Sequence, residues 1–308
     1  MGKKIVVTGG LGFMGSDFVH FIREEHPEFE ISIVDNYSYS ADPERLADLS
    51  SAPPIVNADI RDIDAMKRIT KGADLVVNFA AETHNDNSLV RPLDFVSTNV
   101  NGVAALLEAS RENGFRLHHV STDEVFGDMP VGSDEKFVED SPIHPSSPYS
   151  ASKAAGDSLC LGWFRSFGVD VTISNSANNF GPSQHQEKLI PRSIELIRSG
   201  QKPKIYGDGS NVRDWINVRD HSRAVFEIAT RAISGSRYVI SAHNLVSNIE
   251  LIQTLNQFLG VPADHFEFVT DRPGHDRQYA SDSSKLRSEL AWLPVEKDLK
   301  TWLQELEL

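Results

Sequence analysis

Two adjacent acidic residues, Asp123 and Glu124, follow a short apolar run that is predicted to form a strand. Paired carboxylates at the mouth of a site are costly unless their pKa values differ, so that one stays protonated and the other ionised. Such a pair can eliminate water, because the base takes a proton next to a carbonyl and the acid protonates the departing hydroxyl. Hydride transfer alone needs no such pair. The alternative interpretation is that both acids solvate a surface loop.

Tyr149 and Lys153 are four residues apart at the start of a predicted helix, which places both side chains on one face. A lysine ammonium close to a phenol would lower the pKa of the phenol, so Tyr149 is predicted to act as a base near neutral pH. The spacing alone is weak evidence, because Tyr-x-x-x-Lys occurs by chance on many helices. Its weight comes from the glycine motif near the N-terminus that accompanies it.

Gly9, Gly12 and Gly15 directly follow a predicted strand and open a predicted helix. Glycine there permits a tight turn, brings backbone N–H groups close to a pyrophosphate and lets the helix dipole face the phosphates. Asp35 ends the next predicted strand, where a carboxylate can accept hydrogen bonds from the adenine-ribose hydroxyls. Because it would repel a ribose phosphate, the sequence predicts NAD rather than NADP. Loops also gather glycine for ordinary turns, and Asp35 could simply start a loop.

Asp59 and Ile60 follow the third predicted strand and could hold the adenine ring of the cofactor. The alternative is an aspartate that only caps a helix beginning near Asp62.

The elements that must position these residues alternate short β-rich runs with longer helical stretches. Strands are predicted at residues 4–8, 31–35, 54–57, 75–80, 117–121 and 169–175, and helices at 92–113 and 147–167 carry apolar residues at helical spacing. Such alternation indicates βαβ units that feed a parallel sheet. We therefore predict an α/β fold with a Rossmann-type doubly wound parallel sheet, whose ligands bind at its carboxyl edge.

The alternation becomes irregular after about Pro182, with strands predicted at 204–206 and 237–240 and helices at 188–199, 220–233 and 249–259. We interpret this part as a smaller C-terminal α/β substrate lobe. The predicted domains are residues 1–181, which bind NAD and hold the catalytic residues, and residues 182–308. Because no linker separates them, the boundary is soft and interleaved segments are expected.

The composition is that of an ordinary folded enzyme, with 308 residues, 40% hydrophobic and 24% charged. The formal net charge of -14 argues against a general nucleic-acid binder, because neutralising phosphates requires a basic surface. Cys160 cannot form an internal disulfide and is predicted to be a packing residue. The N-terminus enters a strand without a long apolar stretch, so we predict a cytoplasmic protein without membrane contact. His84, His185 and His275 lack the spacing of a metal site, and no metal is predicted.

The glycine motif, Asp35 and the Tyr149/Lys153 pair together resemble the extended branch of the short-chain dehydrogenase/reductase group. Further segments resemble the dTDP-glucose 4,6-dehydratase family, in the same order and over nearly the whole chain. They are Phe79-Ala80-Ala81-Glu82-Thr83-His84, Ser121-Thr122-Asp123-Glu124-Val125-Phe126-Gly127, Tyr149-Ser150-Ala151-Ser152-Lys153, Asn178-Asn179-Phe180-Gly181-Pro182, Glu187-Lys188-Leu189-Ile190-Pro191, Arg213-Asp214-Trp215 and Arg272-Pro273-Gly274-His275-Asp276-Arg277. The 4-epimerases, UDP-glucuronate decarboxylases and GDP-mannose dehydratases share the first and third of these motifs. They do not share Thr122-Asp123-Glu124 together with the segment Pro273-Gly274-His275-Asp276-Arg277.

This resemblance implies oxidation at C4 of dTDP-glucose by NAD, elimination of water across C5 and C6, and return of the hydride to C6. It implies that Tyr149, with Lys153, is the oxidation base, Thr122 a hydrogen-bonding partner of the sugar, Asp123 the proton donor and Glu124 the proton acceptor. The implied NAD-binding residues are Gly9, Gly12, Phe13, Met14, Gly15, Asp35, Asn36, Asp59, Ile60, Ala80, Ala81, Thr83, Thr98, Tyr149, Lys153 and Asn179. The implied substrate-binding residues are Thr83, His84, Thr122, Asn178, Glu187, Lys188, Leu189, Pro191, Lys204, Tyr206, Arg213, Asn248, Arg272 and His275.

The chain departs from the family pattern at two places. Thr83-His84-Asn85-Asp86-Asn87-Ser88 stands where the family usually has Ser-His-Val-Asp-Arg-Ser, and Phe126 replaces the usual tyrosine. Arg213 suits a bidentate grip on a diphosphate, although a surface ion pair with Asp214 or Asp208 is the alternative.

The family implies a homodimer that pairs the helices at 92–113 and 147–167. Two other functions stay open: a related nucleotide-sugar dehydratase or epimerase that acts on a UDP-sugar, and a non-catalytic NAD-sensing scaffold. The intact set of Tyr149, Lys153, Asp123 and Glu124 argues against the scaffold.

Overall fold

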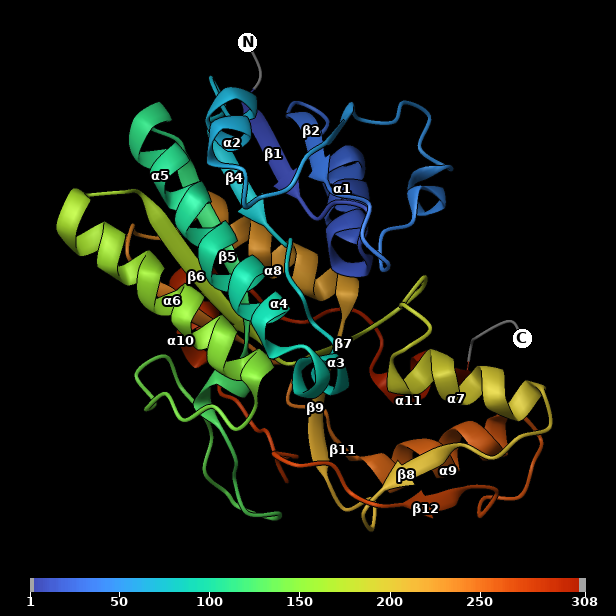
Figure 1. Cartoon of the computed structure of the whole chain (residues 1–308). Coiled ribbons are helices and arrows are strands. Elements are labelled where there is room, and N and C mark those ends of the chain that lie inside the picture. The colour runs from blue at the N-terminus through green and yellow to red at the C-terminus, as the bar shows by residue number, and fades with distance from the viewer. Residues whose placement is uncertain (1–2, 305–308) are drawn as a thin grey trace.

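A seven-stranded parallel sheet forms the larger part of the molecule (Figure 1). The computed structural model describes residues 3–304. The strands are β1 (Lys4–Thr8), β2 (Glu30–Asp35), β3 (Ile55–Asn57), β4 (Leu75–Asn78), β5 (Arg116–Thr122), β6 (Val171–Ser176) and β10 (Arg237–Ile240), in the order β10-β6-β5-β4-β1-β2-β3. The strand order reverses between β1 and β4, which is where open α/β sheets bind their ligands. The predicted α/β class and doubly wound parallel sheet are confirmed.

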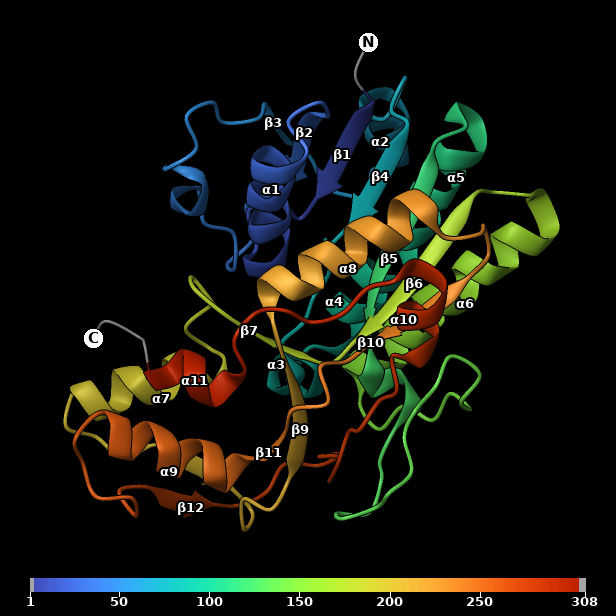
Figure 2. The ribbon, with the colours of Figure 1, turned by 180° about the vertical axis from the view of Figure 1, so that it is seen from behind.

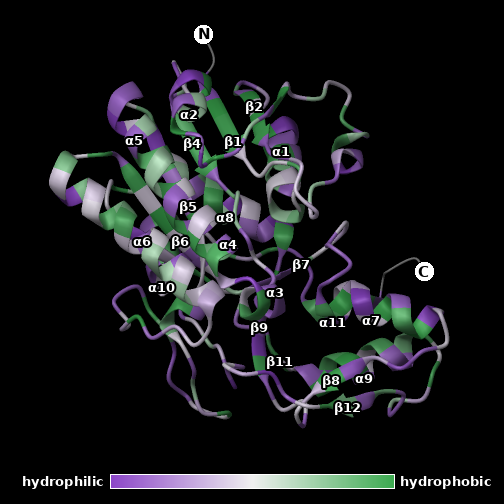
Figure 3. Ribbon diagram, in the orientation of Figure 1, coloured by the Kyte–Doolittle hydropathy of each residue, from purple (hydrophilic) through white to green (hydrophobic). Residues whose placement is uncertain are grey.

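Helices cover both faces of this sheet. α2 (Ile63–Ile69), α5 (Val103–Asn113) and α6 (Pro148–Phe167) pack on the face turned to the viewer in Figure 1. α1 (Phe13–Glu25), α8 (Val218–Arg231) and α10 (Ser284–Leu290) pack on the opposite face, which Figure 2 shows from behind. β1 illustrates the alternation: Ile5 and Val7 point into one layer and Val6 into the other. Because both faces are buried, β1, β2 and β4 are mostly apolar, as the hydrophobic colouring of β1 and β2 shows (Figure 3).

The segment before α5 is less regular than expected. One helix was predicted over 92–113, but the chain forms α3 (Asn85–Val90), α4 (Pro92–Val96), a wide π-helical turn (Ser97–Gly102) and only then α5. Within that turn the buried Asn99 donates from Nδ2 to Glu82 O and to Ser152 Oγ, both at 2.9 Å. These two bonds tie the segment that follows β4 to α6.

The smaller lobe lies beyond the carboxyl ends of the main strands. It contains a sheet of β7 (Asn178–Phe180), β9 (Val212–Asn217) and β11 (Leu245–Ser247), and a pair of β8 (Lys204–Tyr206) and β12 (Glu267–Val269). α7 (Leu189–Arg198), α9 (Asn248–Phe258) and α11 (Leu299–Gln304) pack against these strands. Phe180, Trp215 and Leu255 belong to the hydrophobic core of the lobe.

The strand at 237–240 lies elsewhere than expected. We predicted it in the smaller lobe, but it pairs in parallel with β6 and extends the main sheet. α8, which precedes it, packs beside α1 on one face of that sheet. Only four residues long, the strand carries too weak a pattern to reveal from sequence which sheet it joins. The chain therefore returns to the large sheet after entering the lobe.

Candidate active site

The loop between β1 and α1 is shaped by glycine. Gly9 has φ +70°, and a Cβ there would lie 2.6 Å from Ala80 N, so a side chain is excluded by both conformation and space. A Cβ at Gly15 would press against Gly9 O. The backbone N–H groups at the start of α1 therefore stay accessible to an anion, as a pyrophosphate site requires.

Asp35 is held rigidly at the end of β2. Its side chain is 7% exposed and accepts hydrogen bonds from Leu11 N at 3.1 Å and Tyr37 N at 2.9 Å. Burial raises the pKa of its carboxyl group, and the backbone donors oppose that shift. The bond from Leu11 N ties Asp35 to the glycine loop. The backbone N–H groups of the loop and the Asp35 carboxylate are therefore held in fixed positions relative to each other.

Asp59 and Ile60 line the same pocket. Asp59 receives Arg61 Nη2 at 2.6 Å and Asn36 Nδ2 at 3.3 Å, and the Arg61 hydrogen bonds lower its pKa to about 2. The cap of α2 comes from Asp62, whose side chain accepts from Ala65 N. Asp59 is therefore not needed as the helix cap, which leaves it for the pocket wall.

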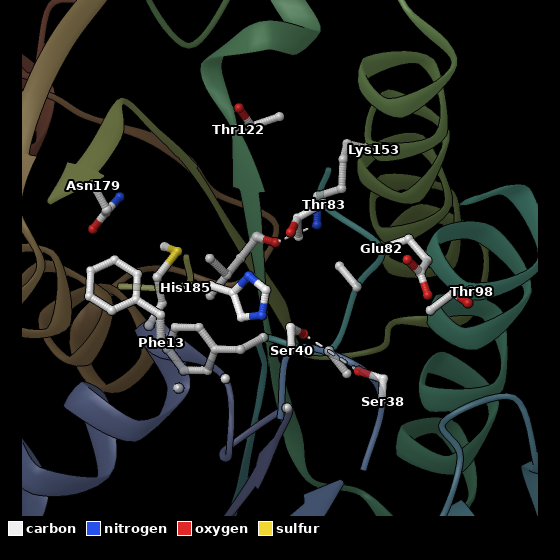
Figure 4. A pocket seen from close by; sticks show the side chains of 18 of the residues that line it. Phe13, Ser38, Ser40, Glu82, Thr83, Thr98, Thr122, Lys153, Asn179 and His185 are labelled. Carbon is white, nitrogen blue, oxygen red and sulfur yellow. Dashed lines mark hydrogen bonds between the residues drawn. The ribbon is translucent and has the colours of Figure 1, made fainter. Parts of the chain in front are cut away.

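All residues predicted to bind NAD line this one pocket: Gly9, Gly12, Phe13, Met14, Gly15, Asp35, Asn36, Asp59, Ile60, Ala80, Ala81, Thr83, Thr98, Tyr149, Lys153 and Asn179. Figure 4 shows labelled side chains around it, with Phe13 and Asn179 on one side and Glu82 and Thr98 on the other. Ser38, Ser40 and His185 also line it and were not predicted, because loop residues without a motif give no sequence signal.

Tyr149 and Lys153 are both buried at the inner end of the pocket, at 8% and 3% exposure. Lys153 Nζ donates to Val120 O at 2.8 Å, and burial lowers the pKa of its ammonium to about 8. The expected lowering of the Tyr149 pKa is wrong for this structure. Burial raises it and the negative charge of Glu124 adds to the rise, while the Thr122 hydroxyl acts in the opposite direction. Proximity to Lys153 on one helix face did not outweigh burial and the three acidic neighbours Glu124, Asp123 and Asp157.

Asp123 is almost completely enclosed. Its side chain is 1% exposed, Oδ1 accepts from Thr122 Oγ1 at 3.4 Å, and Oδ2 has no hydrogen-bond partner among the described residues. Burial raises the pKa of this carboxyl group well above its usual value, and Glu124 beside it raises it further. The environment therefore favours a protonated Asp123, which is the form that a general acid needs.

Glu124 is partly buried and borders more cationic groups than its neighbour does. Burial raises its pKa too, but Arg213, Arg272 and Lys188 lower it. Its Oε2 accepts a hydrogen bond from Asn85 Nδ2 at 3.0 Å. The two adjacent carboxyl groups therefore differ in how readily they ionise. Cations and the Asn85 amide stabilise the charge of Glu124, whereas the enclosed surroundings of Asp123 oppose its charge.

A second pocket adjoins the first and extends into the smaller lobe. Arg213 lies in it, 6% exposed, with Nη2 donating to Asp276 O at 2.7 Å and its guanidinium 4.4 Å from the centre of the Tyr279 ring. Within the part of the chain that the structure describes, no salt bridge joins Arg213 to Asp214 or Asp208. Its terminal nitrogens donate to backbone carbonyl oxygens, which do not neutralise its charge, so Arg213 is a cation on the pocket wall.

Arg272 and Tyr206 meet at Asp86 in the same pocket. Arg272 Nη1 lies 2.8 Å from Asp86 Oδ1, and Tyr206 OH donates to Asp86 Oδ2 at 3.0 Å. His275 Nδ1 pairs with Asp271 Oδ1 at 2.7 Å on the segment that carries Arg272. The bonds to Asp86 join α3 to β8 and to the segment that carries Arg272, so pocket-lining residues from the two lobes are held together.

The second pocket contains most of the predicted substrate-binding residues: Thr83, His84, Asn178, Glu187, Lys188, Leu189, Lys204, Tyr206, Arg213, Asn248, Arg272 and His275. Thr122 lies in the first pocket. Pro191 lines neither, because the turn of α7 brings Arg192 and Ser193 to the wall instead. Asn85, Asp86, Gln184, Trp215 and Tyr279 were missed, although Trp215 lies in a segment that the resemblance singled out and Asn85 and Asp86 lie where the chain departs from the family pattern.

Six residues line both pockets and mark where they join: Thr83, Glu124, Asn178, Gln184, Glu187 and Lys188. A substrate in the second pocket would meet a cofactor in the first at this junction, beside the two carboxylates. Residues 3–304 contain no group of three or more His, Cys, Asp or Glu that could hold a metal ion. They also contain no helix long and apolar enough to span a bilayer.

Comparison with known proteins places the chain among enzymes with this arrangement. The NAD dependent epimerase/dehydratase family matches residues 5–241. A dTDP-glucose 4,6-dehydratase of Mycobacterium tuberculosis is 46% identical over 98% of this chain and 91% of that protein, and one from Escherichia coli is 41% identical over 95% and 89%. A solved dTDP-glucose 4,6-dehydratase from Streptomyces venezuelae with NAD bound has a TM-score of 0.93 and 36% identity, covering 98% of this chain and 94% of that one.

Proposed function

The chain belongs to the NAD dependent epimerase/dehydratase family, and from this premise we propose that it acts as a dTDP-glucose 4,6-dehydratase. The reaction converts dTDP-glucose to dTDP-4-keto-6-deoxyglucose with loss of one water. NAD is the cofactor, and the glycine loop and Asp35 fit it, because glycine lets the loop pass close to the backbone of Ala80 and the loop is hydrogen-bonded to the Asp35 carboxylate at the end of β2.

One observation carries the proposal beyond the family. Glu124 lies where the two pockets join, and Asp123 lines the first pocket beside it. Burial raises the pKa of both carboxyl groups, well above the usual value for Asp123, whereas three nearby cations oppose the rise for Glu124, so Asp123 is the one that keeps its proton to higher pH. An enzyme that only moved hydride would gain nothing from a buried acid next to a base, whereas elimination of water requires both.

Each step uses a group of this chain. Tyr149 takes the proton of the C4 hydroxyl, and NAD, when bound, supplies a reversible acceptor for the hydride that leaves C4. Glu124 takes the proton at C5, and Asp123 protonates the departing hydroxyl at C6. The hydride returns to C6 and solvent supplies the proton at C5, so the cofactor is unchanged over the cycle. Burial and acidic neighbours raise the pKa of Tyr149 in this structure. The positive charge of an oxidised nicotinamide, when bound in the pocket that Tyr149 lines, would favour the phenolate.

The substrate-binding assignments are supported by the charges in the second pocket and by which residues line it near the junction. Arg213, Arg272 and Lys188 bring three cations to the second pocket, where a diphosphate would carry the matching negative charge. Thr83, Thr122 and Asn178 lie at or near the junction and would contact the sugar.

We also propose a homodimeric assembly and a cytoplasmic location. A homodimer through α4, α5 and α6 would cover exposed apolar side chains near these helices, among them Val90 at 78%, Leu93 at 77% and Val96 at 45% exposure. A cytoplasmic location is consistent with Cys160, which is the one cysteine of the sequence and packs in the buried core.

Mass spectrometry of products tests the function directly. Purified protein is offered dTDP-glucose, UDP-glucose and UDP-galactose without added cofactor. We expect a product 18 mass units lighter from dTDP-glucose, by loss of water, and no net NADH. An unchanged mass with inverted C4, or loss of water from a UDP-sugar in preference, would instead support the UDP-sugar alternatives, of which UDP-glucose 4-epimerase from Thermotoga maritima shares the fold at a TM-score of 0.88 and 27% identity.

A further inference from the structure

Asn85, the first residue of α3, lies in the second pocket with its side-chain amide directed at Glu124. Asn85 Nδ2 donates to Glu124 Oε2 at 3.0 Å. The opposite orientation of the amide would bring its carbonyl oxygen against the carboxylate and is excluded by repulsion. The side-chain NH2 of Asn85 therefore donates to Glu124, the residue that is proposed to take the C5 proton.

The two oxygens of Glu124 differ in their contacts. Among residues 3–304, Oε2 has the bond from Asn85, whereas Oε1 has no hydrogen-bond partner and does not belong to the enclosed unpaired atoms. Oε1 therefore faces the open junction of the two pockets. A carboxylate pinned by one oxygen keeps the other at a defined position, which is what efficient proton transfer needs.

The local backbone keeps Asn85 in place. His84 is the N-cap of α3 and accepts a hydrogen bond from Asn87 N at 3.3 Å. The buried Ser88 donates from Oγ to Asn85 O at 2.6 Å, and its backbone N donates to His84 O at 3.2 Å. The carbonyl, and with it the start of the helix, is thus fixed from a buried position one turn away.

We infer that Asn85 is a positioning residue for the elimination step: its amide holds Oε2 of Glu124 and leaves Oε1 to take the C5 proton. This inference rests on the proposed function, since it assigns Asn85 to the base of that reaction. Because Asn85 donates to the charged form of Glu124, its loss should hinder the step that Glu124 performs and spare the oxidation at C4.

Other ionisable groups also lie near Glu124 and influence its pKa. They are Asp123, Tyr149, Lys188, Arg213, Arg272, Asp276 and Tyr279. None of them is altered by substitution of Asn85, so a shift in the titration of the elimination step reports on the amide.

The test compares two steps in single turnovers across pH. Formation of reduced nicotinamide on the enzyme measures oxidation at C4, and deuterium uptake at C5 from heavy water measures proton removal. We expect Asn85→Ala to keep oxidation within about twofold and to slow C5 exchange roughly ten- to a hundredfold. The acidic limb of the C5 exchange profile should move to higher pH, and Asn85→Asp should move it further, because a second carboxylate raises the pKa of Glu124.

Asn87→Ala is the matched control, since it removes the same amide two residues away from a position that lines neither pocket. It should leave both steps near the wild-type rates, and thermal melting checks that each variant is folded. An unmoved acidic limb in Asn85→Ala, or equal slowing of oxidation and exchange, overturns the inference. Failure of the wild-type protein to lose water from dTDP-glucose would instead overturn the proposed function, so the two failures are distinguishable.

Discussion

Asp123 and Glu124 are neighbours in the sequence, yet the fold gives their carboxyl groups different surroundings. Asp123 turns into the protein, where Oδ2 finds no partner among the residues described. Glu124 turns to the junction of the pockets, where Arg213 and Arg272 favour its charge. Both residues lie in the 3-10 helix (Asp123–Phe126) that follows β5, where three residues complete a turn, so adjacent side chains leave the backbone in directions about 120° apart and reach different environments.

This division predicts a bell-shaped pH profile for the loss of water. Glu124 must be ionised, so the rate falls as the pH drops through its pKa, which is raised by burial and lies above that of a free glutamate. Asp123 must be protonated, so the rate also falls as the pH rises through its pKa, which burial raises well above the usual value. The limbs belong to the coupled pair and are measured from single-turnover elimination.

Asp123→Asn separates the two limbs. The amide cannot give up its proton to the departing hydroxyl, so elimination should fall roughly 100-fold or more and the limb at high pH should disappear. The limb at low pH should stay near its wild-type position, because both the amide and a protonated carboxyl group are neutral. A normal basic limb in Asp123→Asn would assign the acid to another residue.

The catalytic residues could be predicted from the sequence, but the direction in which their pKa values shift could not. The spacing of Tyr149 and Lys153 placed them correctly on one helix, but the predicted lowering of the phenol pKa failed because burial and Glu124 outweigh the lysine. Asn85 carried no motif, and its importance comes from a bond between residues 39 positions apart. Contacts of that kind depend on tertiary packing, which local pattern does not report.

Among the elements, the 3-10 helix over Pro43–Leu46 connects parts of the cofactor site that are far apart in sequence. Arg45 Nη1 donates to Leu11 O at 2.8 Å and to Ser40 O at 2.9 Å, and its Nε donates to Ser183 O at 3.0 Å. One side chain thus joins the glycine loop, the loop after β2 and the loop after β7 beside the cofactor pocket.

Arg45→Ala should therefore speed the release of NAD, by roughly tenfold for the loss of about 1.4 kcal/mol of hydrogen bonding across the three loops. Activity of this variant should come to depend on added NAD, whereas the wild-type protein keeps its cofactor through each cycle. Displacement of bound NADH, followed by its fluorescence, measures the rate of release.

Arg23→Ala serves as the control. Arg23 also donates to a loop carbonyl, Ser51 O at 2.7 Å, but it lines neither pocket. Its substitution should leave release unchanged. Equal release rates for Arg45→Ala and the wild-type protein would show that the three loops hold the cofactor without this arginine.

Element prediction succeeded where the pattern was regular. The first six strands are found close to their predicted residues, because each is an apolar run bounded by turn residues. The π-helical turn at Ser97–Gly102 was not predictable, since its helical spacing resembles that of the flanking helices, and its basis is the pair of long-range bonds made by Asn99.

At the scale of the whole molecule, the active site is assembled from both lobes. Glu124 comes from the end of β5, Lys188 from the start of α7, and Arg272 from the segment after β12. β10 and α8 return the chain to the main sheet after the first part of the lobe, so the lobe is attached at several points. Sequence predicted two parts and their order, but the return of β10 depends on strand pairing between distant residues.

This assembly predicts that all steps occur on one bound substrate with one bound cofactor. We expect the hydride removed from C4 to stay in the site until its return, because the two pockets share six lining residues and a sugar in one would therefore adjoin a cofactor in the other. A dehydratase therefore moves the C4 hydrogen to C6 within the same molecule. An epimerase returns it to C4, and a simple dehydrogenase releases it in NADH.

The most direct measurement uses dTDP-glucose deuterated at C4, with the position of the label in the product read by NMR and mass spectrometry. The account predicts a 4-keto-6-deoxy product with deuterium at C6, a C5 hydrogen from solvent and no net NADH. Deuterium recovered at C4, or found in free NADH, would contradict it.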